Sequence, residues 1–132
     1  VHGGFRDDAG TVDAPIGRHP VDRKRMAVTP KNSKPAVTHY EVIARYRGYT
    51  RILCRLETGR THQIRVHMAS IGHPLLGDGV YGAPCPEKGL EGQCLHARRL
   101  KFIHPRTGQL VRLEAPLPEY FTQVISRLGN EI

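Results

Sequence analysis

Residues 59 to 67 read GRTHQIRVH and gather two arginines, two histidines and a glutamine at the start of a segment with helical periodicity. Such a cluster can be a solvated surface, a metal site or a binding site for an anion. The free N–H groups and the positive pole of a helix N-terminus attract anions, and a guanidinium beside them offers a planar fork that suits a carboxylate or a phosphate. The cluster therefore favours a negatively charged partner at this position.

Two other interpretations of the cluster stay open. Arg60 and Arg65 could simply pair with a nearby Asp or Glu, because ion-pair networks look similar in sequence. A metal site fits less well, since His62 and His67 are five residues apart and a helix turns them away from each other, whereas zinc-binding pairs favour a spacing of four. The cysteines and histidines elsewhere show no zinc-finger spacing, so we expect no metal.

The segment THQIRVHMASIG predicts a helix of about three turns that carries the cluster. Three apolar residues recur at i, i+4 and i+7: Ile64, Met68 and Ile71. Thr61 is predicted as the N-cap, and Gly72 is well placed to end the helix. With this start, His62 lies in the first turn and shares a face with Arg65.

Two antiparallel hairpins are predicted around this helix. From Ala36 to Thr58 apolar residues alternate with period two, with a turn at Arg47-Gly48 and a polar outer side. Leu95 to Ala115 predicts a second hairpin around a Pro-Arg-Thr-Gly turn. Short strands are expected at about Gly10 to Ile16 and at Met26 to Val28.

A closing helix and a long loop complete the expected fold. Pro118 opens the helix PEYFTQVISRL. The loop from Leu75 to Gln93 is dense in Gly and Pro, and loops of this length are often functional. Asp78, between two glycines, is expected to form a turn rather than to act as a catalyst. The elements together predict an α+β domain, a largely antiparallel mixed sheet with helices packed on one side.

Composition limits the function classes. The chain has 132 residues, enough for one domain with a core, and carries 20 Lys and Arg against 12 Asp and Glu, a net charge of +8. This charge favours a polyanionic partner, above all nucleic acid, although many domains are simply basic. There is no apolar run long enough to cross a membrane and no secretion signal, so we expect a soluble protein. The odd number of cysteines argues for reduced thiols, although Cys85 and Cys94 flank a loop and could meet.

The longer sequence pattern is specific. The run LETGRTHQIRVHMASIGHPLLGDGVYG is preceded by GTVDAPIGRHP and KPAVTHY and followed by LHARRLKFIHP and APLP. From about Gly10 to Pro118 the chain resembles the C-terminal part of the catalytic domain of ribosomal large-subunit pseudouridine synthases of the RluA/RluD type, most of all the RluD branch. The resemblance implies a cytoplasmic enzyme that isomerises uridine in large-subunit ribosomal RNA to pseudouridine without a cofactor.

The resemblance also assigns residues. Arg65 matches the family arginine that ion-pairs with the catalytic aspartate, the acid that drives cleavage between the ribose and uracil N1 before the base rejoins through C5. Ile64 and Leu95 match positions that line the uracil pocket. The family's aspartate lies in a His-Arg-Leu-Asp stretch that does not occur in these 132 residues, and the S4-like RNA-binding domain is missing too. We therefore expect Arg65 to lack its counter-ion in this chain.

Residues 1–132 are accordingly expected to be the C-terminal portion of a catalytic domain, inactive by itself. Such a portion would expose sheet edge and apolar surface, which invites self-association. Candidate phosphate contacts are four basic residues: Arg23, Lys24, Arg25 and Arg60. Plain surface charge is the alternative for each of them. Two further alternatives for the whole chain stay open, a non-catalytic RNA-binding module and a basic structural protein of the ribosome.

Overall fold

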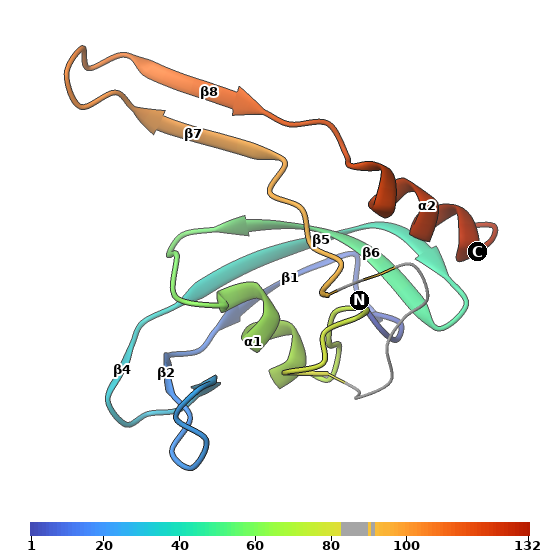
Figure 1. Cartoon of the computed structure of the whole chain (residues 1–132), viewed down its shortest axis with the longest axis horizontal. Helices are drawn as coiled ribbons and strands as arrows, with labels where there is room; N and C mark the ends of the chain where they lie inside the picture. Colours follow the sequence, from blue (N-terminus) through green and yellow to red (C-terminus); the bar gives the residue numbers. More distant parts are fainter. Residues whose placement is uncertain (83–89, 91) are drawn as a thin grey trace.

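The structure is a computed structural model that describes residues 1–82, 90 and 92–132 (Figure 1). Its elements are, in chain order, β1 (Ala9–Asp13), β2 (Ile16–Arg18), β3 (Met26–Val28), β4 (Ser33–Lys34), β5 (Val37–Tyr46), β6 (Tyr49–Leu56), α1 (Gln63–Ser70), β7 (Arg99–Ile103), β8 (Leu110–Glu114) and α2 (Glu119–Arg127). Every strand pair in this part of the chain is antiparallel, and the strands form three sheets in the orders β1-β5-β6, β3-β2-β4 and β7-β8. The predicted α+β class is confirmed.

The β1-β5-β6 sheet is built around the predicted long hairpin. β5 and β6 pair along their length, and the turn lies at the predicted Arg47-Gly48, where Gly48 adopts a φ of 76°. Thr38, Ala44 and Tyr46 are buried, as the alternation predicted for the inner face. A β-bulge follows Val42 and adds local twist.

The short strands depart from the prediction in two respects. The strand expected at Gly10 to Ile16 is two strands, β1 and β2, and Pro15 lies between them without an N–H to donate to a ladder. β3 occupies Met26–Val28 as predicted. β4, a pair of residues beside β2, was not predicted because two residues carry no periodic pattern.

Helix α1 contributes residues to both apolar clusters of the core. Its Met68 packs with Val12 and Leu75 under the β1-β5-β6 sheet, and its Val66 packs with Ile16 and Ala36 near β2. Met68 is fully buried. The helix therefore contributes to two apolar clusters at once, and its position fixes the segment that precedes it.

The predicted start of α1 was wrong and its predicted end is confirmed. The helix has 8 residues, about two turns, and its N-cap is His62 with a φ of 55°, not Thr61. At the other end Gly72 adopts a φ of 86°, its N–H donates to the Ala69 carbonyl, and the next N–H donates to the Met68 carbonyl. These bonds form a Schellman motif, which requires the left-handed conformation that glycine supplies.

The predicted second hairpin is β7-β8, which projects from the rest of the molecule (Figure 1). Leu100 pairs with Leu113 on one face of the ribbon, and Lys101 pairs with Arg112 on the other. Leu100 and Leu113 are 56% and 53% exposed. The apolar face of this ribbon is thus open to solvent, and a two-stranded ribbon alone is marginally stable.

Two thiols lie in the described part of the chain. Cys54 in β6 and Cys94 are free and partly buried. Burial raises the pKa of the Cys54 thiol to about 11, against a smaller lowering effect of the N-terminal ammonium, and burial also raises the pKa of Cys94. Both thiols are therefore weak nucleophiles at neutral pH. The pairing considered for Cys85 and Cys94 lies outside the described residues.

Substitution of Gly72 by alanine tests the helix end. A Cβ at Gly72 would meet no heavy atom within 4 Å, so the effect of Gly72→Ala isolates the backbone strain at a φ of 86°. We expect a loss of about 1 kcal/mol in the free energy of unfolding, measured by urea denaturation. Gly4→Ala is the matched control, because Gly4 also has open space but no positive φ. Equal stability of the two variants would contradict the Schellman assignment.

Candidate functional site

A pocket of about 270 Å³ lies where the start of α1 meets the end of β6 and the chain before β7. Its lining residues are Leu56, Arg60, His62, Gln63, Ile64, Arg65, Gln93 and Leu95. Four of the residues predicted from sequence lie in this lining: Arg60, Ile64, Arg65 and Leu95. The structure thus brings together residues that are up to 35 positions apart in the chain. The volume suits one small ring better than a large ligand.

Arg65 has a partner in this chain, contrary to the expectation that its counter-ion is missing. Its Nε donates to Asp78 Oδ2 at 2.8 Å and its Nη2 donates to Asp78 Oδ1 at 3.0 Å. The side chains of Arg65 and Asp78 are 11% and 0% exposed. The expectation failed because it treated Asp78 only as a turn former. The turn is real, but the same carboxylate also neutralises the guanidinium.

Asp78 Oδ1 takes part in both the turn and the ion pair, whereas Oδ2 accepts, among the described residues, only from Arg65. Its Oδ1 accepts the backbone N–H groups of Val80 and Tyr81, each at 3.1 Å. Burial by itself raises the pKa of the Asp78 carboxyl. Four effects together outweigh burial and hold this pKa below its usual value: the hydrogen bond from Arg65, the N–H of Tyr81, the charge of Arg65 and the N–H of Val80. The hydrogen bond to Asp78 raises the pKa of Arg65 in return, against burial. Both groups are ionised at neutral pH.

The ion pair leaves part of the Arg65 fork available. A guanidinium has five N–H donors, and Asp78 takes Nε–H and one hydrogen of Nη2. Within the described residues Nη1 makes no hydrogen bond. Arg65 can therefore bind a second anion through its Nη1–Nη2 edge while Asp78 holds the other edge.

Tyr81 lies against the same guanidinium. The Arg65 Cζ is 5.0 Å from the centroid of the Tyr81 ring, and the Arg25 Cζ is 5.4 Å from it. The Tyr81 hydroxyl is 2.8 Å from His62 Nδ1. Asp78 and Tyr81 were missed as site residues in the sequence, where their only signal was their place in a long Gly-rich loop.

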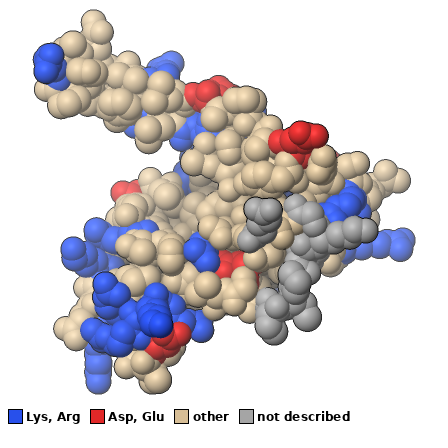
Figure 2. Space-filling view, in the orientation of Figure 1, with Lys and Arg blue, Asp and Glu red and all other residues tan. Residues whose placement is uncertain are grey.

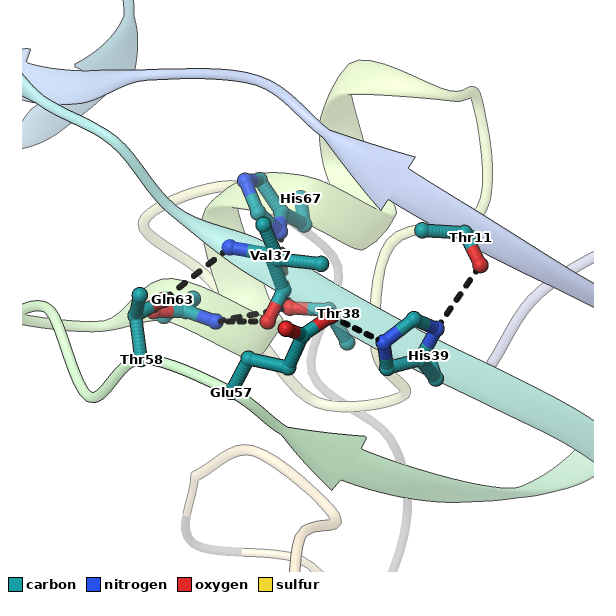
Figure 3. A network of polar contacts seen from close by, with 8 residues as sticks. All are labelled: Thr11, Val37, Thr38, His39, Glu57, Thr58, Gln63 and His67. Atoms are coloured by element: carbon teal, nitrogen blue, oxygen red, sulfur yellow. Dashed lines mark hydrogen bonds and ion pairs between the residues drawn. The ribbon is translucent and has the colours of Figure 1, made fainter.

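A buried hydrogen-bond network holds the wall of the pocket in place (Figure 3). The Gln63 side chain accepts from the Thr58 hydroxyl at 2.7 Å and from the Arg60 N–H at 3.0 Å. It donates to the Val37 carbonyl at 3.0 Å and to Thr38 Oγ1 at 2.9 Å. All four hydrogen-bonding positions of the amide are used, so Gln63 closes the turn before α1 and is not free to bind a ligand.

The network continues to His67, which is fully buried. The Ala14 carbonyl can only accept, so His67 Nε2 donates to it at 2.8 Å. His67 Nδ1 is hydrogen-bonded to the Thr38 hydroxyl at 2.7 Å, and the same hydroxyl oxygen accepts from Gln63. Both ring nitrogens of His67 are therefore used inside the core, away from His62 in the pocket lining.

The exposed rim of the network is shown in the same view. His39 on β5 bonds to Thr11 Oγ1 on β1 at 2.8 Å and contacts the Glu57 carboxylate on the chain that leaves β6 (Figure 3). It therefore links three segments of the sheet region. Among the described residues there is no cluster of three or more His, Cys, Asp or Glu side chains that could hold a metal ion.

The predicted phosphate contacts fall into two groups. Arg23 and Lys24 are exposed in the loop between β2 and β3, and Arg25 is partly buried against Tyr81. Figure 2 shows Lys and Arg side chains gathered over the β2-β3-β4 region, at the lower left. Arg60 lines the pocket, where its Nε donates to the Pro35 carbonyl at 2.9 Å. The charge of Arg60 thus lies at the pocket, and that of Arg23 and Lys24 lies on the nearby surface.

Replacement of the buried acid tests the ion pair. Asp78→Asn leaves the mostly buried Arg65 guanidinium without a counter-ion, and we expect a loss of about 3 kcal/mol in the free energy of unfolding at pH 7. Because the folded-state pKa of Asp78 is lowered, its contribution is present above about pH 4 and is lost as the pH falls below that value. Urea denaturation between pH 3 and 7 should show a smaller acid-dependent loss in Asp78→Asn than in the parent.

Asp13→Asn is the control for this measurement, since Asp13 is an exposed residue of β1. It should leave both the stability at pH 7 and its acid dependence close to the parent's. A pH profile of Asp78→Asn parallel to that of the parent would show that Asp78 carries no depressed pKa.

Comparison with known proteins places this site in a family. A family model described as RNA pseudouridylate synthase matches residues 1–70. The RNA pseudouridine synthase YlyB of Bacillus subtilis strain 168, itself described as uncharacterized, is 54% identical over 97% of this chain and 42% of its own length. Ribosomal large subunit pseudouridine synthase D of Escherichia coli K12 is 48% identical over 92% of this chain and 41% of its own length. The chain thus spans about two fifths of these relatives.

The solved structures that resemble this chain belong to the same family as its sequence relatives. Human RNA pseudouridylate synthase domain containing 1 matches with a TM-score of 0.75 and 27% identity, over 96% of this chain and 62% of that one. Human RNA pseudouridylate synthase domain containing 4 matches with a TM-score of 0.68 and 30% identity, over 92% of this chain and 56% of that one. No helix in the described part of the chain is long and apolar enough to cross a membrane. The family model, the sequence relatives and the structural neighbours all agree, and the chain belongs to the RNA pseudouridylate synthase family.

Proposed function

We propose that this chain is the C-terminal portion of the catalytic domain of an RNA pseudouridine synthase that acts on uridine in large-subunit ribosomal RNA. The observation that carries the proposal is the pocket in which Arg65, Ile64 and Leu95 meet, with one edge of the Arg65 fork free. The relatives named ribosomal large subunit pseudouridine synthase D support the same substrate. We propose a cytoplasmic location on the same ground.

In this proposal Arg65 works between two carboxylates. Asp78 holds Nε–H and one hydrogen of Nη2, and the catalytic aspartate, from a segment outside these 132 residues, binds the Nη1–Nη2 edge. A positive charge at hydrogen-bond distance keeps that acid ionised and fixes its direction. Ile64 and Leu95 provide apolar surface for the uracil ring. No cofactor enters the reaction, which only exchanges the uracil atom bonded to the ribose.

The basic side chains outside the pocket are proposed to bind the RNA backbone. A uridine within a stacked strand must be extruded before it reaches a pocket of this size, and the neighbouring phosphates must be held while that happens. Arg23, Lys24 and Arg25 lie on a loop next to Tyr81, which itself contacts Arg65. This arrangement suits phosphates on either side of an extruded nucleotide.

A non-catalytic RNA-binding module is the second candidate, because the His-Arg-Leu-Asp stretch is not among these residues. The two candidates differ in the reading frame before Val1, which includes that stretch only if the chain is part of an enzyme. The open apolar face of β7-β8 also supports the proposal that the isolated chain self-associates, which sedimentation would detect.

A tritium-release assay tests the proposed activity. The 132-residue chain should release no tritium from C5-labelled uridine in ribosomal RNA, because the His-Arg-Leu-Asp stretch that carries the family's catalytic aspartate is not among these residues. A protein extended upstream to include His-Arg-Leu-Asp should release it, and Arg65→Lys in that protein should lower kcat by a factor on the order of 10², since an ammonium lacks the second fork edge. Turnover by the 132-residue chain alone would refute the missing-acid argument.

The salt dependence of binding tests the phosphate contacts. Lys24→Ala removes an exposed cation without disturbing the ring of Tyr81. For binding to a large-subunit ribosomal RNA fragment, we expect the slope of log Kd against log salt concentration to fall by almost one. Arg127→Ala is the control, because Arg127 lies at the end of α2, far from the loop in Figure 1. A slope for Lys24→Ala equal to the parent's would remove this loop from the RNA interface.

A further inference from the structure

Tyr81 is fixed by the turn that also carries the partner of Arg65. Its N–H donates to Asp78 Oδ1 at 3.1 Å, and the N–H of Gly82 donates to the Asp78 carbonyl at 2.9 Å. A Cβ on Gly82 would lie 2.6 Å from that carbonyl oxygen, so the close turn requires glycine there. Because of this turn, the Asp78 carboxylate and the Tyr81 ring, from one short segment, both contact the Arg65 guanidinium.

The ring and the carboxylate restrain Arg65 in different directions. Asp78 binds it edge-on through two parallel hydrogen bonds, which sets the direction of the fork. Tyr81 lies 5.0 Å from the Arg65 Cζ and covers the guanidinium as a cation–π partner, which restricts rotation of the fork plane. An arginine that must present one remaining edge to a second anion needs both restraints.

The Tyr81 ring also lies against a second guanidinium, that of Arg25. The Arg25 Cζ is 5.4 Å from its centroid, and among the described residues Arg25 has no carboxylate partner. The Arg25 Nε is buried without a hydrogen-bond partner in that part of the chain. Of the two guanidiniums at this ring, only that of Arg65 is paired with a carboxylate of the described residues, and the excess positive charge favours an anion nearby.

The hydroxyl of Tyr81 makes a different connection. It accepts the N–H of Met26 at 3.0 Å, directly after the basic residues 23–25, and donates to His62 Nδ1 at 2.8 Å. His62 is the N-cap of α1 in the left-handed conformation, which a non-glycine residue adopts only when its surroundings hold it there. The hydroxyl therefore ties the basic loop to the start of the helix that carries Arg65.

We propose that Tyr81 is a positioning residue with two separable roles, its ring orienting Arg65 in the pocket and its hydroxyl fixing the basic loop relative to that pocket. This inference rests on the proposed function, since it assigns the pocket to the uracil and the loop to RNA phosphates. Loss of the hydroxyl loosens the RNA contact surface. Loss of the ring in addition misdirects the guanidinium that holds the catalytic acid.

Two substitutions separate the roles. Tyr81→Phe removes only the hydroxyl, and in the upstream-extended enzyme we expect a KM for ribosomal RNA about three- to tenfold higher with kcat within twofold of the parent. Tyr81→Leu removes the ring as well, and we expect kcat to fall by about tenfold in addition. Tyr49→Phe, at the start of β6 and away from the pocket, is the control and should change neither constant. Identical constants for Tyr81→Phe and Tyr81→Leu would overturn the two-role assignment.

A spectroscopic readout on the 132-residue chain does not depend on turnover. In ¹⁵N NMR spectra, Tyr81→Phe should shift the His62 Nδ1 resonance, because it loses its phenolic donor, and should leave the Arg65 Nε–H resonance in place. Tyr81→Leu should also shift Arg65 Nε–H, because the ring current is lost. Absence of any catalysis in the extended parent, together with these shifts, would reject the proposed function and leave the contacts of Tyr81 intact. An unchanged His62 resonance in Tyr81→Phe would overturn the role of the hydroxyl.

Discussion

The ion pair between Arg65 and Asp78 is the constraint on which the site depends. Two charged side chains, 11% and 0% exposed, can stay ionised there because they meet through two hydrogen bonds and because two backbone N–H groups also donate to Oδ1 of the carboxylate. That arrangement fixes the direction of the guanidinium. It also determines which edge of the guanidinium stays available to another anion.

A network of hydrogen bonds around Gln63 holds the backbone at the start of α1 in place. Gln63 uses all four positions of its amide to close the turn before α1, and Thr38 and His67 extend these bonds into the core (Figure 3). Buried polar groups that are fully satisfied make a local structure unique, because any other arrangement would leave one of them unpaired. These bonds therefore hold the pocket wall, and the separate loop of Asp78 and Tyr81 holds the Arg65 side chain on it.

Charge and apolar surface are distributed unevenly over the molecule. Cations gather over the β2-β3-β4 region in Figure 2, whereas the projecting β7-β8 ribbon leaves large apolar side chains in solvent. The first surface suits a polyanion and the second suits burial against other protein surface. The chain spans about two fifths of the length of its pseudouridine synthase relatives.

The amino-acid sequence by itself determined the α+β class, both hairpins and the end of α1 at Gly72, and its resemblance to a family pointed to Arg65, Ile64 and Leu95, which line one pocket. Period-two alternation, turn residues and the φ freedom of glycine act over a few positions, so they can be recognised locally. The start of α1 and the partner of Arg65 were decided by the tertiary structure. The bonds from Gln63 to β5, the buried carboxylate of Asp78 and the ring shared by Arg25 and Arg65 all join residues distant in the chain, and only folding brings such groups into contact.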